Sequence, residues 1–104
     1  MSKVRGIRGA TTADSNTKEA IQEATQELLV RVVEANAVDL DDVAAAIFTT
    51  SQDLNADFPA VAARKMGWEH VPLLCGHEMK VPDSQSRCIR VLLLVNTEAS
   101  PQDI

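Results

Sequence analysis

Aromatic residues and excess positive charge are both scarce in this chain of 104 residues. It contains no Tyr, and its three aromatic residues are Phe48, Phe58 and Trp68. Ten Lys and Arg stand against fifteen Asp and Glu, which gives a formal net charge of −5 at pH 7. Binding of nucleic acid or of an anionic membrane needs a basic surface, and base stacking needs aromatic side chains. We therefore expect no nucleic-acid and no membrane partner, and any anion site to be built from a few local cations.

Cysteines and long apolar runs are scarce as well. Cys75 and Cys88 are the two cysteines. Residues 1–5 lead into strand-like sequence without the apolar stretch of a signal peptide, and no apolar run is long enough to span a bilayer. Two cysteines without an export signal do not make a disulfide framework. We expect both thiols to be reduced and the protein to be cytoplasmic.

Apolar residues are plentiful, at 45% of the chain, which is typical of a folded protein. No repeat or linker divides the sequence, so we expect one domain over residues 1–104. Alternating and helical patterns predict strands at 3–11, 43–50, 71–75 and 87–97, and helices from the cap residues 14–17 to about 36 and over 59–66. The longer helix has an apolar stripe made of Ile21, Ala24, Leu28, Val32 and Ala35. Strands separated by helices predict an α/β or α+β domain in which this helix covers a sheet.

The strand predicted over residues 87–97 places an arginine in apolar surroundings. One face of this strand is purely aliphatic, and the face that contains Arg90 is also largely apolar, so we predict that the strand is buried on both sides. A buried guanidinium is costly unless it meets an anion. Arg90 is therefore expected either to form an internal salt bridge, for example with Glu78, or to bind a carboxylate or another electron-rich oxygen of a ligand. Arg8, in the first predicted strand, is either a surface arginine or a second cation of that site.

Other candidate sites are weaker. Metal-ligating side chains occur at His70, Cys75, His77, Glu78 and Cys88, but their spacing fits no standard zinc pattern, so we expect no metal. Cys75 and His77 share one face of a strand, yet no third group that would activate the thiol is evident. There is also no glycine-rich phosphate loop of a standard type.

Short segments along the chain match a known family in the same order. They are VRGIRGATT (4–12), DL (53–54), FPA (58–60), Arg64, GW (67–68), VP (71–72), Cys75, EM (78–79) and CIRV (88–91). Each segment alone is unspecific, but the ordered set covers nearly the whole chain. The sequence resembles the short monofunctional chorismate mutases, the AroH class.

The resemblance implies a mixed β-sheet covered by helices on one face, assembled into a pseudo-barrel homotrimer with active sites between neighbouring subunits. It implies an isomerase that converts chorismate to prephenate, toward phenylalanine and tyrosine, without a cofactor. Members of the class continue into a tail that carries a Tyr and further basic residues. Because this sequence ends at Ile104 and has no Tyr, we expect that tail to be missing. Val61 stands where some relatives carry a lysine, so one peripheral cation is absent.

The resemblance also implies the site residues. Arg8, Glu78 and Arg90 match the catalytic and substrate-binding positions of the family. The segment that lines the ligand corresponds to Leu74, Cys75, Gly76, His77 and Glu78. Phe58 and Arg64 match residues that surround the same cleft, expected from the adjacent subunit.

The implied reaction is a pericyclic rearrangement, which needs no nucleophile, metal or proton transfer. An enzyme then contributes geometry and electrostatics. We expect Arg90 to stabilise the negative charge that grows on the ether oxygen, Arg8 to bind a carboxylate, and Glu78 to accept a hydrogen bond from the substrate hydroxyl. Two alternatives stay open: a non-catalytic trimeric module that binds a small carboxylate, and an interaction subunit that regulates another aromatic-pathway enzyme.

The absence of a metal pattern generates a first prediction. Chorismate mutase activity should survive exhaustive dialysis against a chelator, because the rearrangement requires no Lewis acid. The rate of chorismate absorbance loss, measured before and after dialysis, checks this. A loss of rate that added divalent metal restores would contradict the prediction.

Overall fold

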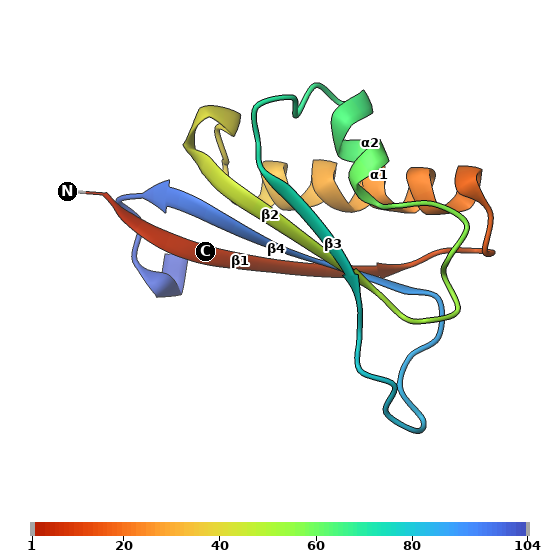
Figure 1. Cartoon of the computed structure of the whole chain (residues 1–104). Helices are drawn as coiled ribbons and strands as arrows, with labels where there is room; N and C mark the ends of the chain where they lie inside the picture. The colour runs from red at the N-terminus through yellow and green to blue at the C-terminus, as the bar shows by residue number, and fades with distance from the viewer. Residues whose placement is uncertain (1, 104) are drawn as a thin grey trace.

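Four strands form one sheet, and they are β1 (Lys3–Thr12), β2 (Val43–Thr50), β3 (Leu73–His77) and β4 (Cys88–Thr97). The computed structural model describes residues 2–103, so Met1 and Ile104 lie outside the described residues. The strand order is β1-β4-β2-β3, with β4 antiparallel to both neighbours and β2 parallel to β3 (Figure 1). The mixed sheet and the predicted strands are confirmed. β3 begins at Leu73, two residues later than predicted, after Pro72, which has no N–H to donate to a sheet.

Two helices, α1 (Lys18–Ala35) and α2 (Ala60–Lys65), lie on the same side of this sheet (Figure 1). α1 begins where the side chain of Thr17 accepts a hydrogen bond of 3.1 Å from the N–H of Ala20. α2 begins after Pro59, and Gly67, with φ of +92°, turns the chain away from it. Two short 3₁₀ helices, η1 (Leu40–Asp42) and η2 (Pro101–Asp103), complete the described elements.

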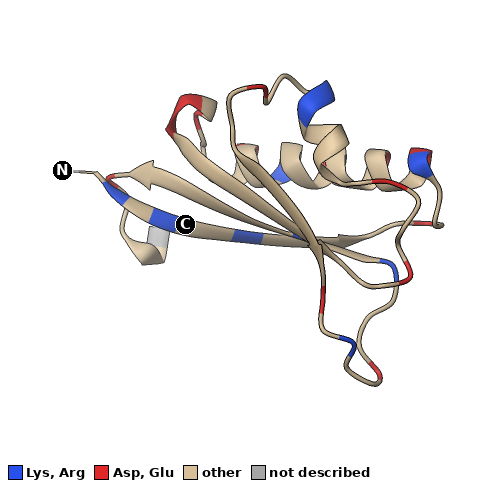
Figure 2. Ribbon diagram, viewed as in Figure 1, with Lys and Arg blue, Asp and Glu red and all other residues tan. Residues whose placement is uncertain are grey.

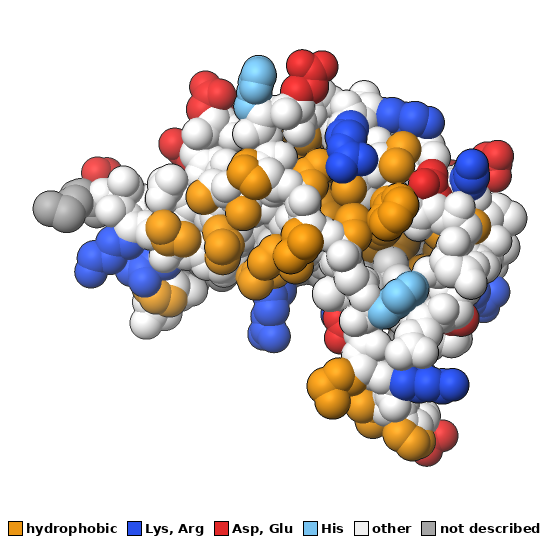
Figure 3. All heavy atoms as spheres, viewed as in Figure 1, with side chains coloured by type: hydrophobic (Ala, Val, Ile, Leu, Met, Phe, Trp, Pro, Cys, Tyr) orange, Lys and Arg blue, Asp and Glu red, His pale blue; other side chains and the backbone are white. Residues whose placement is uncertain are grey.

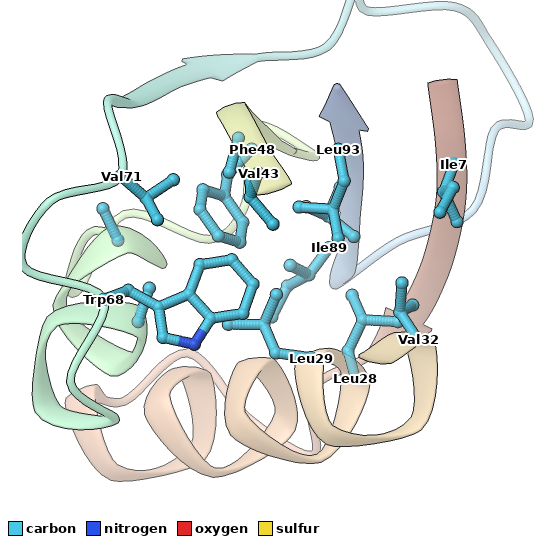
Figure 4. Close-up of a cluster of buried hydrophobic side chains, with 14 of the residues drawn as sticks. Ile7, Leu28, Leu29, Val32, Val43, Phe48, Trp68, Val71, Ile89 and Leu93 are labelled. Atoms are coloured by element: carbon cyan, nitrogen blue, oxygen red, sulfur yellow. The ribbon is translucent and has the colours of Figure 1, made fainter. Parts of the chain in front are cut away.

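The hydrophobic core lies between the helices and one face of the sheet. Figure 4 shows Leu28, Leu29 and Val32 of α1 and Trp68 pointing toward side chains of all three long strands. The predicted stripe of α1 is confirmed at Ile21, Leu28 and Val32, but it is wrong at Ala35, which is exposed. Two residues outside the predicted stripe, Thr25 and Leu29, are buried as well. Thr25 can be buried because its hydroxyl donates a hydrogen bond of 2.7 Å to the carbonyl of Ile21.

A register shift in β2 keeps its apolar residues on the core side. Val43 pairs with Val95, but Ala45 pairs with Leu94, so one extra residue of β2 lies between the two pairs. Such a bulge reverses the alternation of the faces. As a result Val43 is buried along with Ala46 and Phe48, although strict alternation would have placed it on the opposite face.

The prediction that β4 is buried on both sides is wrong. Its aliphatic face is buried, whereas on the other face Arg90 and Asn96 are exposed and Leu92 and Leu94 are half-buried. The physical reason is that both helices cover the same side of the sheet. The uncovered side, which we call the open face, also carries alternate residues of β1, β2 and β3, and Figure 3 shows apolar side chains exposed over the strands.

Gly9 lies directly against α1 and gives a second prediction. A Cβ added there would lie 2.7 Å from Val32 Cγ2 and 3.0 Å from Leu28 Cδ1. Gly9→Ala should therefore lower the free energy of unfolding by about 1–3 kcal/mol through overpacking, as measured by urea unfolding.

Gly6 provides the matched control on the same strand. An added Cβ would meet only the flexible end of Leu92, at 3.3 Å. Gly6→Ala should lower the free energy of unfolding by less than Gly9→Ala does. Equal losses of stability in the two variants would show that overpacking against α1 does not cause the loss at Gly9.

Candidate functional site

Arg90 and Glu78 form an ion pair on the open face. Arg90 Nη1 lies 3.0 Å from Glu78 Oε1, with the two side chains 49% and 33% exposed. Arg90 comes from β4, the second strand of the sheet, and Glu78 follows β3 directly, where its N–H donates a hydrogen bond of 2.8 Å to the carbonyl of Thr50. That backbone hydrogen bond continues the β2–β3 ladder by one residue and holds the carboxylate over β2.

Thr49 is a further member of this cluster. It pairs with Arg90 across β2 and β4, and its hydroxyl donates a hydrogen bond to Oε2 of Glu78, the oxygen that Arg90 does not contact. Both oxygens of the carboxylate are thus engaged. Sequence reasoning missed Thr49, because its position beside Arg90 depends on the register of β2 against β4, which includes a bulge.

A hollow of about 480 Å³ opens beside this cluster, lined by residues of β1, β4 and β2 together with Glu78. Arg8 lines it from β1, where Ala10, two residues further along, pairs with Arg90. The hollow therefore holds two guanidinium groups and one carboxylate. The ribbon in Figure 2 shows Lys and Arg positions, in blue, spaced along β1 of this otherwise acidic chain. This excess of one positive charge suits a small anion that carries carboxylates.

The two roles expected for Arg90 are compatible in this geometry. The internal salt bridge with Glu78 is present, but it uses one terminal nitrogen of the guanidinium. A guanidinium has five N–H donors, and about half of the side chain is exposed toward solvent. The remaining donors can reach a ligand in the hollow while Glu78 holds the group in place.

A second hollow, of about 510 Å³, lies on the other side of β3, beside the start of α2. Its lining includes four residues of the predicted site, namely Phe58, Cys75, Gly76 and His77. Phe58 is 66% exposed. The ring atom Nδ1 of His77 is hydrogen-bonded to Thr50 Oγ1 at 3.1 Å, which fixes the ring against β2. This hollow contains neither Arg8 nor Arg90.

The remaining predicted residues lie apart from both arginines. Leu74 is 63% exposed on the open face, where it pairs with Ile47. Arg64 lines a third hollow on α2 together with Trp68. A single chain therefore brings Arg8, Glu78 and Arg90 together, but it leaves Phe58 and His77 in the second hollow and Arg64 in the third.

The weaker alternatives gain no support from the geometry. Burial raises the pKa of the Cys75 thiol above its ordinary value, so the thiol is protonated at neutral pH and is a poor nucleophile. Within residues 2–103 no three side chains of His, Cys, Asp or Glu cluster in a way that would hold a metal ion. Over the same residues, none of the helices has the length and apolar character needed to cross a membrane.

Comparison with known proteins gives consistent matches over nearly the whole chain. The family model described as chorismate mutase type I matches residues 4–104. Chorismate mutase AroH of Thermus thermophilus is 52% identical over 101 residues, which are 96% of this chain and 82% of that protein. The same enzyme of Bacillus subtilis (strain 168) is 43% identical over 101 residues, covering 96% and 79%. The solved chorismate mutase from Clostridium thermocellum Cth-682 matches with a TM-score of 0.94 at 47% identity, covering 96% of this chain and 89% of that chain.

Proposed function

Since this chain belongs to the chorismate mutase type I family and is an isomerase that converts chorismate to prephenate, we propose that Arg90, Glu78 and Arg8 form its catalytic centre. The observation that carries this proposal is the hollow of about 480 Å³ in which two guanidinium groups face one carboxylate. The substrate is a dianion with one hydroxyl group, and these three side chains complement those charges and that hydroxyl.

Arg90 has the central role in this proposal. As the ether C–O bond of chorismate breaks, negative charge develops on the ether oxygen, and a donor already aimed at that position stabilises the transition state more than the ground state. Glu78 holds the guanidinium in orientation from one side. The donors facing the hollow then meet the ether oxygen and a neighbouring carboxylate. Preorganised donors of this kind contribute roughly 3–4 kcal/mol to lowering a barrier.

Arg8 and Glu78 select the compact conformer of the substrate. Arg8 binds the second carboxylate from β1, across the hollow from Glu78. Glu78 accepts the hydrogen bond of the substrate hydroxyl, and Thr49 and Arg90 fix its carboxylate for this purpose. Holding both ends of the substrate converts a rare reactive conformer into the bound one, which adds to the charge stabilisation by Arg90.

We further propose that the complete site forms between two chains of a homotrimer. The hollow with Phe58 and Cys75 lies beside β3, one outer strand of the sheet, whereas Arg8 lies on β1, the opposite outer strand. A neighbouring copy that sets its β3 side against the open face would bring Phe58, Cys75 and His77 to the arginines. The half-buried Ile47, Leu92 and Leu94 of the open face give such a contact its apolar area.

The remaining proposals concern the domain, the cellular location and the cofactor. We propose that residues 1–104 act as one domain built on a single hydrophobic cluster, and that the protein works in the cytoplasm without a cofactor. Identities of 52% and 43% to chorismate mutases favour catalysis over the non-catalytic binding module.

The role of Arg90 generates a third prediction. Arg90→Lys keeps the charge but loses the planar array of donors, so kcat should fall by roughly 100- to 1,000-fold, with little change in thermal unfolding. The measurement is the steady-state rate of chorismate loss together with calorimetry.

Arg31→Lys is the matched control, because Arg31 forms an ion pair of the same 3.0 Å length with Glu27 on the exposed side of α1. It should leave kcat unchanged. Near-normal turnover in Arg90→Lys would rule out the assigned role.

The shared site generates a fourth prediction. As pure proteins, Arg90→Ala and Phe58→Ala should each have a strongly reduced kcat/KM for chorismate. Mixed trimers refolded from equal amounts should recover activity, because about a quarter of the sites then combine an intact Arg90 with an intact Phe58 from the neighbouring chain, for random mixing in a cyclic trimer. Mixed trimers as inactive as the pure variants would contradict a site made by two chains.

A further inference from the structure

The connection between β2 and α2, residues 51–59, presents Phe58 without any helix or strand of its own. Leu54 is 1% exposed and Pro59 is buried, so the chain is anchored in the core on both sides of residues 55–58. Between them Phe58 stands 66% exposed. An exposed side chain on an irregular segment has a defined position only if the backbone beside it is held.

Asn16 holds that backbone from the residues just before α1. Its side-chain oxygen accepts hydrogen bonds from two consecutive backbone N–H groups, those of Asn55 and Ala56, both at 3.0 Å. Its side-chain nitrogen donates a third hydrogen bond, of 2.8 Å, to Asn55 Oδ1. One amide therefore satisfies two adjacent backbone donors about forty positions away in the sequence.

A second contact fixes the next two residues. Asp57 accepts the backbone N–H of Phe58 at 2.8 Å with one oxygen and the side chain of Gln22 at 2.6 Å with the other. Gln22 in turn accepts a hydrogen bond of 2.7 Å from Lys65 of α2. The hydrogen bond from Gln22 lowers the pKa of Asp57, which keeps the carboxylate charged and accepting at neutral pH. The segment is thus tied to Asn16, before α1, through Asn55 and Ala56, and to Gln22 of α1 through Asp57.

Asn16 is not required for starting α1. The helix N-cap is Thr17, whose hydroxyl accepts the N–H of Ala20. The side chain of Asn16 turns instead to the segment 51–59, so its contacts serve the position of that segment. The two neighbouring residues therefore have separable roles, one in capping the helix and one in holding Phe58.

We propose that Asn16 is a positioning residue for substrate binding, which acts by fixing the backbone that presents Phe58. This inference rests on the proposed role of Phe58 in the site. Asn16 does not touch the substrate; it limits the orientations of a side chain that does. Its contribution appears in the affinity for chorismate, because the developing charge at the ether oxygen is met by Arg90 from another part of the sheet.

The test compares three variants at position 16 and its neighbour. In Asn16→Ala the two released N–H groups belong to exposed or half-exposed residues and are hydrated by water, so the protein should fold. KM should rise roughly fivefold or more while kcat stays within about twofold. The reason is that the freed segment must become ordered when chorismate binds, which lowers the affinity. Asn16→Asp keeps an acceptor for both N–H groups but loses the donor to Asn55 Oδ1, so its KM should lie between those of the unaltered protein and Asn16→Ala.

Thr17→Ala is the control for a purely structural effect. It removes the cap of α1 and should lower the melting temperature at least as much as Asn16→Ala, yet leave KM unchanged. An unchanged KM in Asn16→Ala, or an equal rise of KM in Thr17→Ala, would overturn the inference.

Phe58→Ala separates this inference from the proposed function. It should raise KM by itself, and adding Asn16→Ala to it should have no further effect, because the positioned side chain is already gone. If Phe58→Ala leaves KM unchanged, the role of Phe58 fails and the inference fails with it. If Phe58→Ala raises KM but Asn16→Ala still adds its own increase on that background, the site proposal stands and Asn16 acts by another route.

Discussion

The ion pair between Arg90 and Glu78 is the contact on which the site depends. At 3.0 Å and with both side chains partly exposed, such a pair contributes little to stability, roughly 0–1 kcal/mol. Its value is orientation: Glu78 engages one nitrogen of the guanidinium, and Thr49 holds the other oxygen of Glu78. A weak but directional pair suits a site of this kind, because it orients the guanidinium and leaves its other N–H donors to a ligand oxygen.

The pair exists only because one face of the sheet is left uncovered. Both helices pack on the side that carries Phe48 and Ile89, so neither of them shields Arg90 and Glu78 on the other side. A domain of this size buries a modest fraction of its surface, and a face with half-buried leucines beside charged groups is unfavourable in water. Covering the open face with further copies would remove apolar area from water and enclose Arg90 in a medium where its charge acts more strongly.

Periodicity was sufficient to predict the strands and helices, because each has one apolar face that the core requires. It was insufficient for β4, where two apolar faces suggested burial on both sides. Sequence shows that a face is apolar but does not show whether the same chain or another covers it. The arginines were identifiable as candidates because a charge in an apolar strand is unusual. Thr49 and Asn16 were not, since their partners are fixed by strand register and by a loop about forty positions away.

The two hollows differ in how the backbone around their residues is held. This difference is the reason for proposing Asn16 as a positioning residue beside Phe58. Arg8 and Arg90 stand on adjacent strands in continuous register, so the sheet alone sets the distance between them. Phe58 stands on an irregular segment, where no ladder of backbone hydrogen bonds fixes its direction. Hydrogen bonds that Asn16 and Asp57 accept from backbone N–H groups, and one that Gln22 donates to Asp57, take the place of that ladder. In the proposed assembly, a Phe58 that is already ordered would spare the substrate the cost of ordering this segment on binding.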